Sequence, residues 1–205
     1  MKLTDILITI VCGEALALLA ADFLKEYEGV FEIAKWTFLF LFPVLSIIVF
    51  WFVDLISKKL PFLLQLAKYF LVGVIATLID LKVYGLLTWF FGLELAMIIG
   101  VSKGISFLVS VLVKFIGNKY WAFEETKKEG IKEEFSKFLI VTFIGLLIDL
   151  GFFFYFSKIL GPQFGISSEV WVKISVILAA VVAAAWNFLS YKFIVFKKQD
   201  ASPIS

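Results

Sequence analysis

Six long apolar runs constrain this chain more than any other feature of its sequence. A helix needs about 20 apolar residues to cross a hydrocarbon core about 30 Å thick, and in lipid the backbone must satisfy its own hydrogen bonds. With 62% hydrophobic residues, the 205-residue chain leaves little for a soluble domain. The sequence therefore predicts an all-α membrane protein with about six transmembrane helices. The runs lie near Ile6–Leu24, Trp36–Ile56, Leu66–Phe90, Leu95–Gly117, Phe138–Ser157 and Val170–Tyr191.

The lysines predict how these helices are oriented. All 19 basic residues are Lys, and twelve of them lie on one side of the predicted membrane, against three on the other. Because cytoplasmic loops carry the excess of basic residues, both termini are expected in the cytoplasm of a cell-membrane protein. The chain has no His and a single cysteine, Cys12, which excludes a His metal site, a Cys cluster and an internal disulfide. No metal or other cofactor is expected.

The last four predicted helices repeat one pattern. The segment "LAKYFLVGVIATLIDL" returns 69 residues later as "FSKFLIVTFIGLLIDL", which matches Asp80 with Asp149. The helices that follow end alike, in "KFIGNKYWAF" and "NFLSYKFIVF", and match Lys119 with Lys192. Two successive hairpins of the same orientation indicate a parallel internal repeat. The predicted parts are a two-helix extension at 1–60, a four-helix domain at 61–198 and a disordered tail at 199–205.

Four charged residues are expected at one depth in the bilayer. Asp80 lies 12 residues beyond Lys68, roughly 18 Å from the cytoplasmic edge, and Lys103 roughly 12 Å below the outer edge. The repeat places Asp149 and Lys173 at the same level. A charge that faces lipid costs about 2.5–3.5 kcal/mol, so the four are expected to pair around a pseudo-twofold axis. They form either a polar substrate site or structural ion pairs, and both interpretations stay open.

A polar seam continues from this level toward the cytoplasm. Its members recur three or four residues apart, on one face of a helix, where they can line a path. Each lysine near the cytoplasmic rim could instead extend its amine to lipid headgroups. A separate pair between Lys82 and Glu14 is expected to dock the first helix. The candidate substrate-binding residues are Asp80, Lys103, Asp149, Lys173, Ser106, Ser110, Lys114, Asn118, Lys119, Asn187 and Lys192.

These motifs resemble the GtrA-like family of small membrane proteins. The similarity covers about 65–197 and rests on an Asp-bearing helix followed by a helix with a polar and aromatic end, twice over. Three features depart from the family pattern: the added segment 1–60, Lys114 where the second repeat has Asn187, and Lys119 in place of Arg. The last change weakens a phosphate site, because Lys lacks the two-pronged hydrogen bonding of Arg.

The resemblance implies a function in cell-surface polysaccharide or glycan synthesis. Members of the family are thought to flip a polyprenyl-phosphate-linked sugar across the membrane. A lipid-linked sugar, membrane lipids and a membrane glycosyltransferase are therefore the implied partners, and nucleic acid is not among them. No segment resembles a nucleotide-binding or glycosyltransferase motif, so the chain is not expected to be an enzyme.

Two other functions stay open. A membrane anchor or scaffold for a polyprenyl-phosphate glycosyltransferase would use the charged loop Glu124–Lys137 as its contact surface. A small proton-coupled transporter would depend on a carboxylate, namely Asp80, Asp149 or Glu14. Four core helices are few to enclose a path, so a homo-oligomer is also open.

Overall fold

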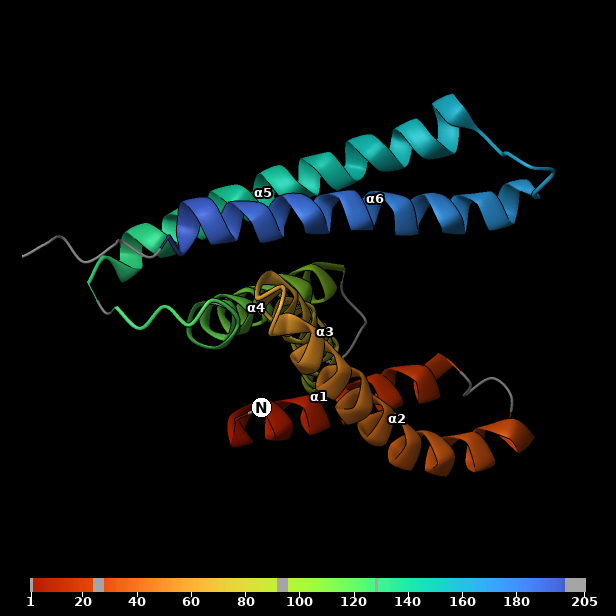
Figure 1. Cartoon of the computed structure of the whole chain (residues 1–205). Helices are drawn as coiled ribbons and strands as arrows, with labels where there is room; N and C mark the ends of the chain where they lie inside the picture. The colour runs from red at the N-terminus through yellow and green to blue at the C-terminus, as the bar shows by residue number, and fades with distance from the viewer. Residues whose placement is uncertain (1, 24–27, 92–95, 128, 198–205) are drawn as a thin grey trace, which may run out of the picture. The chain divides into compact units, whose positions relative to one another are not determined.

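The computed structural model describes residues 2–23, 28–91, 96–127 and 129–197, without the side chains of residues 19, 21–23, 28–35 and 96–97. Every regular element in these ranges is helical (Figure 1). Three short η segments are π-helical, with hydrogen bonds that span one residue more than those of an α-helix. The elements are α1 (Leu3–Phe23), α2 (Glu28–Ser57), α3 (Phe62–Phe91), α4 (Ala96–Gly117), η1 (Asn118–Ala122), α5 (Ile131–Phe154), η2 (Tyr155–Leu160), α6 (Ser168–Ser190) and η3 (Tyr191–Val195).

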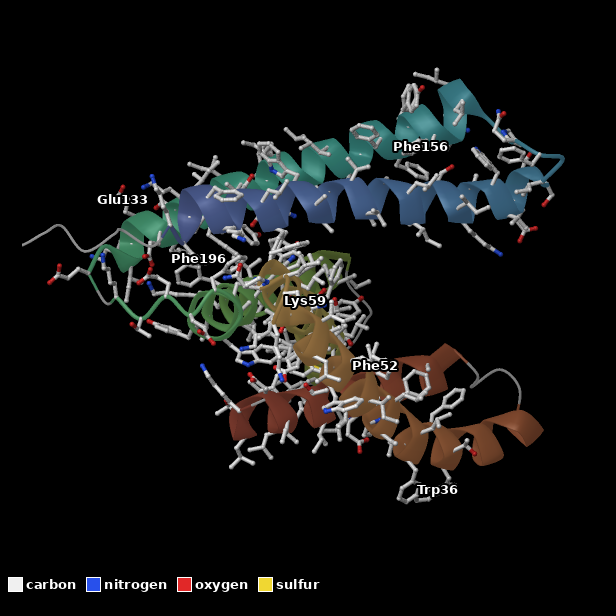
Figure 2. The ribbon with its side chains drawn as sticks, viewed as in Figure 1. Trp36, Phe52, Lys59, Glu133, Phe156 and Phe196 are labelled. Atoms are coloured by element: carbon white, nitrogen blue, oxygen red, sulfur yellow. The ribbon has the colours of Figure 1, made fainter. Side chains whose placement is uncertain are left out.

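Five helical segments are long and apolar enough to cross a membrane, which confirms a multi-pass membrane protein. Large apolar side chains such as Trp36 and Phe52 lie on the helix surfaces, both more than half exposed (Figure 2). Lipid chains solvate such groups well. The predicted run Ile6–Leu24 coincides with α1 but ends outside the described residues, so this sixth span stays a prediction. The five spans are Trp36–Ser57, Phe62–Phe91, Ile98–Ala122, Ile131–Leu160 and Ser168–Val195.

The first compact unit, Met1–Glu124, contains α1 to α4 and η1. α1 packs closely on α2 because Gly13 has no side chain, and a Cβ there would overlap the backbone of Pro43. α2 bends along its length (Figure 1), as expected of a helix with an internal proline. Gly117 admits the Val72 side chain in the same way, since a Cβ would lie 2.9 Å from it. α3 and α4 therefore form a close hairpin.

The second compact unit, Glu125–Ser205, contains the hairpin of α5 and α6, which run side by side in opposite directions (Figure 1). Near its loop, the indole of Trp171 donates to the Phe156 carbonyl oxygen at 2.8 Å. Nearer the other end, Gly145 leaves room for Asn187, whose amide a Cβ would overlap. A hydrogen bond at one end and a close helix contact toward the other hold the hairpin together.

Both hairpins end in the same local geometry. η1 follows α4 and η3 follows α6, and each is closed by a π-type hydrogen bond. The N–H of Phe123 donates to the Asn118 carbonyl oxygen at 2.9 Å, and that of Phe196 donates to the Tyr191 carbonyl oxygen at 2.8 Å. Sequence alignment of the two helix ends matches these pairs at an offset of 73 residues. The shared geometry supports the predicted duplication, which itself stays a prediction.

The compact units do not follow the predicted domain boundary near residue 60. α1 and α2 group with the first hairpin, and the division falls between Glu124 and Glu125. The compact units are defined by contacts between residues, whereas the predicted domains are defined by the internal repeat. The division into a 1–60 extension and a 61–198 domain therefore stays a prediction. The predicted tail at 199–205 lies outside the described residues.

Candidate substrate site within the membrane

Asp80 on α3 and Lys103 on α4 form the ion pair that their depths predict. The Nζ of Lys103 lies 2.6 Å from Oδ2 of Asp80. The Ser106 hydroxyl donates to the other carboxylate oxygen, Oδ1, at 2.7 Å. Lys103 and Ser106 are three residues apart, so both reach the carboxylate from one face of α4. A carboxylate, an ammonium and a hydroxyl therefore meet inside one membrane-spanning hairpin.

The three groups differ in exposure, which leaves the ammonium accessible. Ser106 is fully buried, whereas the side chains of Asp80 and Lys103 are 19% and 53% exposed. The Tyr84 ring lies close to the amine, with its centroid 5.9 Å from Nζ of Lys103. An ammonium has three donors, and Asp80 takes one of them. An anion or a hydroxyl group can therefore reach Lys103 without any helix moving.

The second hairpin does not repeat this ion pair, contrary to the prediction. Lys173 instead pairs with Glu169, one turn away on α6, at an Nζ–Oε1 distance of 3.1 Å. Both of these side chains are more than 70% exposed. Asp149 is half-buried, and its carboxylate has no ion pair or hydrogen bond within the described ranges. Asp149 and Lys173, which were expected to pair, therefore do not contact each other.

The register of α6 explains why the second pair is missing. The matching π-helical ends place Val176 where the first hairpin has Lys103. They likewise place Ala179 where it has Ser106. Lys173 lies three residues before Val176, about 4.5 Å along the helix from the position that pairing requires. Since neither apolar side chain can donate a hydrogen bond, α6 offers nothing to a carboxylate at this level.

The rest of the predicted seam is only partly enclosed. Asn118 is fully buried, and its Nδ2 donates to the Lys114 carbonyl oxygen at 2.8 Å. The side-chain oxygens of Asn118 and Asn187 are buried, and neither has a hydrogen-bond partner in the described part of the chain. Lys114 and Ser110 are half-buried. These two amide oxygens can still accept a hydrogen bond from a ligand or from water.

The two rim lysines have different surroundings. Lys119 in η1 is fully buried, with its Nζ 5.6 Å from the centroid of the Tyr120 ring. Lys192 in η3 is half-buried, with its Nζ 5.6 Å from the centroid of the Phe193 ring. Burial of Lys119 favours a gating or structural role over contact with lipid headgroups. For Lys192, a place in the polar seam and contact with lipid headgroups both stay open.

A family model of the GtrA/DPMS transmembrane domain matches residues 68–196, which is more than half of the chain. The chain belongs to the GtrA/DPMS family. No curated protein and no solved structure matches it. The GtrA/DPMS match begins on α3 and ends just after η3, so it includes both hairpins and the site of Asp80 and Lys103. α1 and α2 precede it.

A charge cluster that sequence reasoning missed, buried at Asp5 and Lys68 and exposed at Lys2 and Glu124, joins α1 to the GtrA/DPMS domain. The Nζ of Lys68 lies 3.0 Å from Oδ1 of Asp5 and 3.3 Å from Oε1 of Glu124. The Trp121 indole donates to the same Asp5 oxygen at 2.8 Å. Lys2 pairs with Glu124 at 2.9 Å. These residues all stand at the ends of apolar runs, where the sequence indicates only solvated loop charges.

Hydrogen bonds within this cluster lower the pKa of both carboxyls. The ammonium groups of Lys2 and Lys68 hold the pKa of Glu124 below its usual 4.5. Burial raises the pKa of Asp5, but hydrogen bonds from Trp121 and Lys68 outweigh burial and leave this pKa lowered. Both carboxyls are therefore charged at neutral pH, where two anions face two cations.

The expected pair between Lys82 and Glu14 does not form among the described residues. Lys82 is exposed and Glu14 is half-buried, and neither takes part in an ion pair there. The contact between Asp5 and Lys68 docks α1 onto α3 instead. The sequence predicted that α1 is docked by an ion pair, but it indicated the wrong residues and the wrong depth.

Proposed function

We propose that this membrane protein binds a lipid-linked sugar and moves it across the bilayer without changing its covalent structure. The observation that carries the proposal is the site of Asp80, Lys103 and Ser106, which a GtrA/DPMS domain holds inside a membrane-spanning hairpin. Ionisable residues within a span are rare and default to a functional role. Family membership suggests lipid-linked sugar translocation.

The chemistry of the site suits the head of such a lipid. Lys103 can bind a phosphate oxygen, and Asp80 and Ser106 can exchange hydrogen bonds with sugar hydroxyls. In the free protein the Lys103 ammonium is held by Asp80 at 2.6 Å. A phosphate would therefore compete with the carboxylate for the same ammonium. Competition of this kind keeps binding reversible, as release on the far side of the membrane requires.

The finer proposal names a carrier, a process and a partner. The carrier is a polyprenyl phosphate, the process is synthesis of a cell-surface polysaccharide or glycan, and the partner is a membrane glycosyltransferase. Under this proposal the protein itself is not an enzyme. Lys173 leaves the proposed site because it pairs with Glu169. The remaining candidates on the two hairpins are Ser110, Lys114, Asn118, Lys119, Asp149, Asn187 and Lys192.

Two lysine substitutions, one in each hairpin, test the proposal. The protein would be reconstituted into vesicles with a labelled polyprenyl-phosphate sugar, and the rate of transbilayer movement would be measured. We expect Lys103→Leu to lower this rate at least about tenfold, because a charge-assisted hydrogen bond contributes about 1.5–3 kcal/mol. Lys173→Leu should stay within about twofold of the wild-type rate. An unchanged rate in Lys103→Leu would show that this residue is not part of the substrate site. Equal losses of rate in Lys103→Leu and Lys173→Leu would show that the site is not confined to the first hairpin.

A polar cleft in the second unit favours a second candidate function, the anchoring of a glycosyltransferase. The cleft has a volume of about 440 Å³ and carries charges of both signs. Such a surface can take up the charged side chains of a protein partner. Replacing Lys127, Glu129 and Lys137 by Gln, three residues that line the cleft, should abolish co-purification of the enzyme but leave lipid transport intact. The cleft is lined by Glu125, Lys127, Glu129, Gly130, Glu133, Glu134, Lys137, Ile194, Val195 and Lys197.

A further inference from the structure

An apolar groove lies in the first unit, between α1, α2 and α3. Its volume is about 360 Å³, and nine of its ten lining residues are apolar, Ser46 being the exception. Leu16 contributes from α1, Val49 and Val53 from α2, and Ala67 from α3. The α2 part falls within the span Trp36–Ser57, so the groove lies at the depth of lipid chains. Water does not fill a cavity of this lining, whereas hydrocarbon does.

Close helix contacts form the groove before any ligand arrives. Gly13 brings α1 against Pro43 of α2, so closely that no side chain fits between them. Cys12 brings α1 against α3, with its Sγ 3.5 Å from the Leu71 carbonyl oxygen. These contacts hold α1 against both walls of the groove. The groove is therefore a fixed feature of this unit, and a chain that enters it does not have to separate helices.

Two cations follow the α2 wall of the groove along the chain. Lys58 and Lys59 lie in the turn that joins α2 to α3 (Lys59 is labelled in Figure 2), six residues or fewer beyond Val53. Both are exposed, and neither takes part in an ion pair with a described residue. The neighbouring Lys68 is not available, because Asp5 and Glu124 hold its amine. The α2 wall of the groove is thus followed, within about two helical turns, by two exposed ammonium groups.

We propose that this groove binds one chain of an anionic bilayer phospholipid, whose phosphate lies at Lys58 and Lys59. An apolar groove whose α2 wall is followed by two cations complements an amphiphile with one long chain in the groove and a negative head. Basic residues next to a span attract anionic lipids. Eight of the ten lining residues precede the GtrA/DPMS match, which begins at residue 68, so this site would give α1 and α2 a function. The inference does not depend on the proposed transport function.

The site is separate from the candidate substrate site. Asp80 lies nine residues beyond Leu71 on α3, about 14 Å farther along the helix. A head group held at Lys58 and Lys59 therefore does not reach Lys103. The occupant is a lipid of the bilayer rather than the cargo, and blocking one site should leave the other site able to bind.

Lipid retention by the full-length protein tests this proposal. The protein would be extracted with a mild detergent from vesicles of equal parts phosphatidylglycerol and phosphatidylethanolamine, and bound lipid would be counted by native mass spectrometry. The wild type is expected to retain one phosphatidylglycerol. Ala67→Phe, which fills the groove, should lower retention at least about fivefold, whereas Ala180→Phe on the exposed face of α6 should not. Val49→Trp fills the groove from an exposed position and replaces Ala67→Phe if that variant does not accumulate.

Charge substitutions distinguish recognition of the lipid head group from binding of the lipid chain. Lys58→Gln with Lys59→Gln should abolish the preference for phosphatidylglycerol while one lipid of either kind is still retained. Lys132→Gln with Lys158→Gln, two exposed lysines in the other unit, should keep the preference. Unchanged retention in both groove-filling variants would overturn the proposal. Displacement of the bound phospholipid by an equimolar polyprenyl phosphate would also overturn it, since the groove would then belong to the cargo.

Discussion

The side chain of Lys68 lies between two carboxylates, those of Asp5 and Glu124, and is only 2% exposed. Its amine is 3.0 Å from Asp5 and 3.3 Å from Glu124. Loss of one partner from a buried pair leaves an uncompensated charge, which destabilises a protein far more than an exposed pair stabilises it. The matching lysine of the second hairpin, Lys137, pairs instead with Glu133 on its own helix, at an exposed position and a distance of 2.7 Å. One repeated residue therefore has two different structural roles.

Lys68→Met tests this difference between two matching lysines. We expect it to lower the free energy of unfolding by about 3 kcal/mol, the lower end of the range for a broken buried pair, because Trp121 still donates to Asp5. Lys137→Met, the matched control, should change it by less than about 1 kcal/mol. Denaturant titration in detergent micelles measures both. Adding Asp5→Asn to Lys68→Met should recover part of the loss, and no recovery would contradict this account.

The lowered pKa of Glu124 predicts a stability that depends on pH. Since its pKa is lower in the folded protein than its usual 4.5, Glu124 stabilises the fold above that pH. This stability is lost as the pH falls through the folded pKa, and the carboxyl of Asp5 acts in the same direction. Melting temperature should therefore fall as the pH drops below the usual 4.5 of a Glu carboxyl, and fall less in Glu124→Gln. Glu129→Gln, an exposed control, should follow the wild-type curve.

At the scale of the helix, a shift in register decides which hairpin holds an ion pair. α4 and α6 end in equivalent π-helical segments, but their lysines do not stand at equivalent distances from those ends. Lys103 therefore faces Asp80, whereas Lys173 lies about one helical turn beyond the level of Asp149. Depth in the bilayer is a coarse coordinate, and an ion pair requires agreement within a few ångströms.

Restoring the register should create the missing pair. Val176 occupies the position of Lys103 and is 52% exposed, so Val176→Lys is expected to place an amine beside Asp149. A double-mutant cycle with Asp149→Asn should give a coupling energy of about 1 kcal/mol in denaturant unfolding. Ile177→Lys, also exposed but one residue farther around the helix, should give none. Zero coupling for Val176→Lys would show that the two hairpins differ by more than register.

For the whole molecule, the charge cluster bears on how the helices of the first unit run. Asp5 near the start of α1 contacts Lys68 near the start of α3, and Trp121 in η1 donates to the same carboxylate. The starts of α1 and α3 and the end of the first hairpin therefore lie at one level of the first unit. α2 must return to this level to meet α3, so α1 has to run away from it. This arrangement is compatible with α1 as the sixth span, whereas the cytoplasmic location of the N-terminus stays a prediction from the lysines.

Cysteine labelling tests the orientation of the second hairpin. The chain has one cysteine, Cys12, which is fully buried, so a membrane-impermeant maleimide should give little background. Glu129→Cys is expected to react only from the cytoplasmic side, and Ser168→Cys only from the outside. Labelling of intact cells and of inverted vesicles distinguishes the two. A reversed pattern would contradict the orientation inferred from lysine, and reaction from one common side would contradict a membrane-spanning α5.

The sequence by itself determined the membrane class, the helices, the GtrA-like resemblance and the pair of Asp80 with Lys103. These follow from run length, residue type and helical rise, which act along the chain and need no knowledge of how helices contact one another. Only the tertiary structure decided that Lys173 does not meet Asp149 and that Lys68 is buried between Asp5 and Glu124. A side chain reaches only a few ångströms, so its partner depends on the register and rotation of packed helices, which sequence periodicity leaves open.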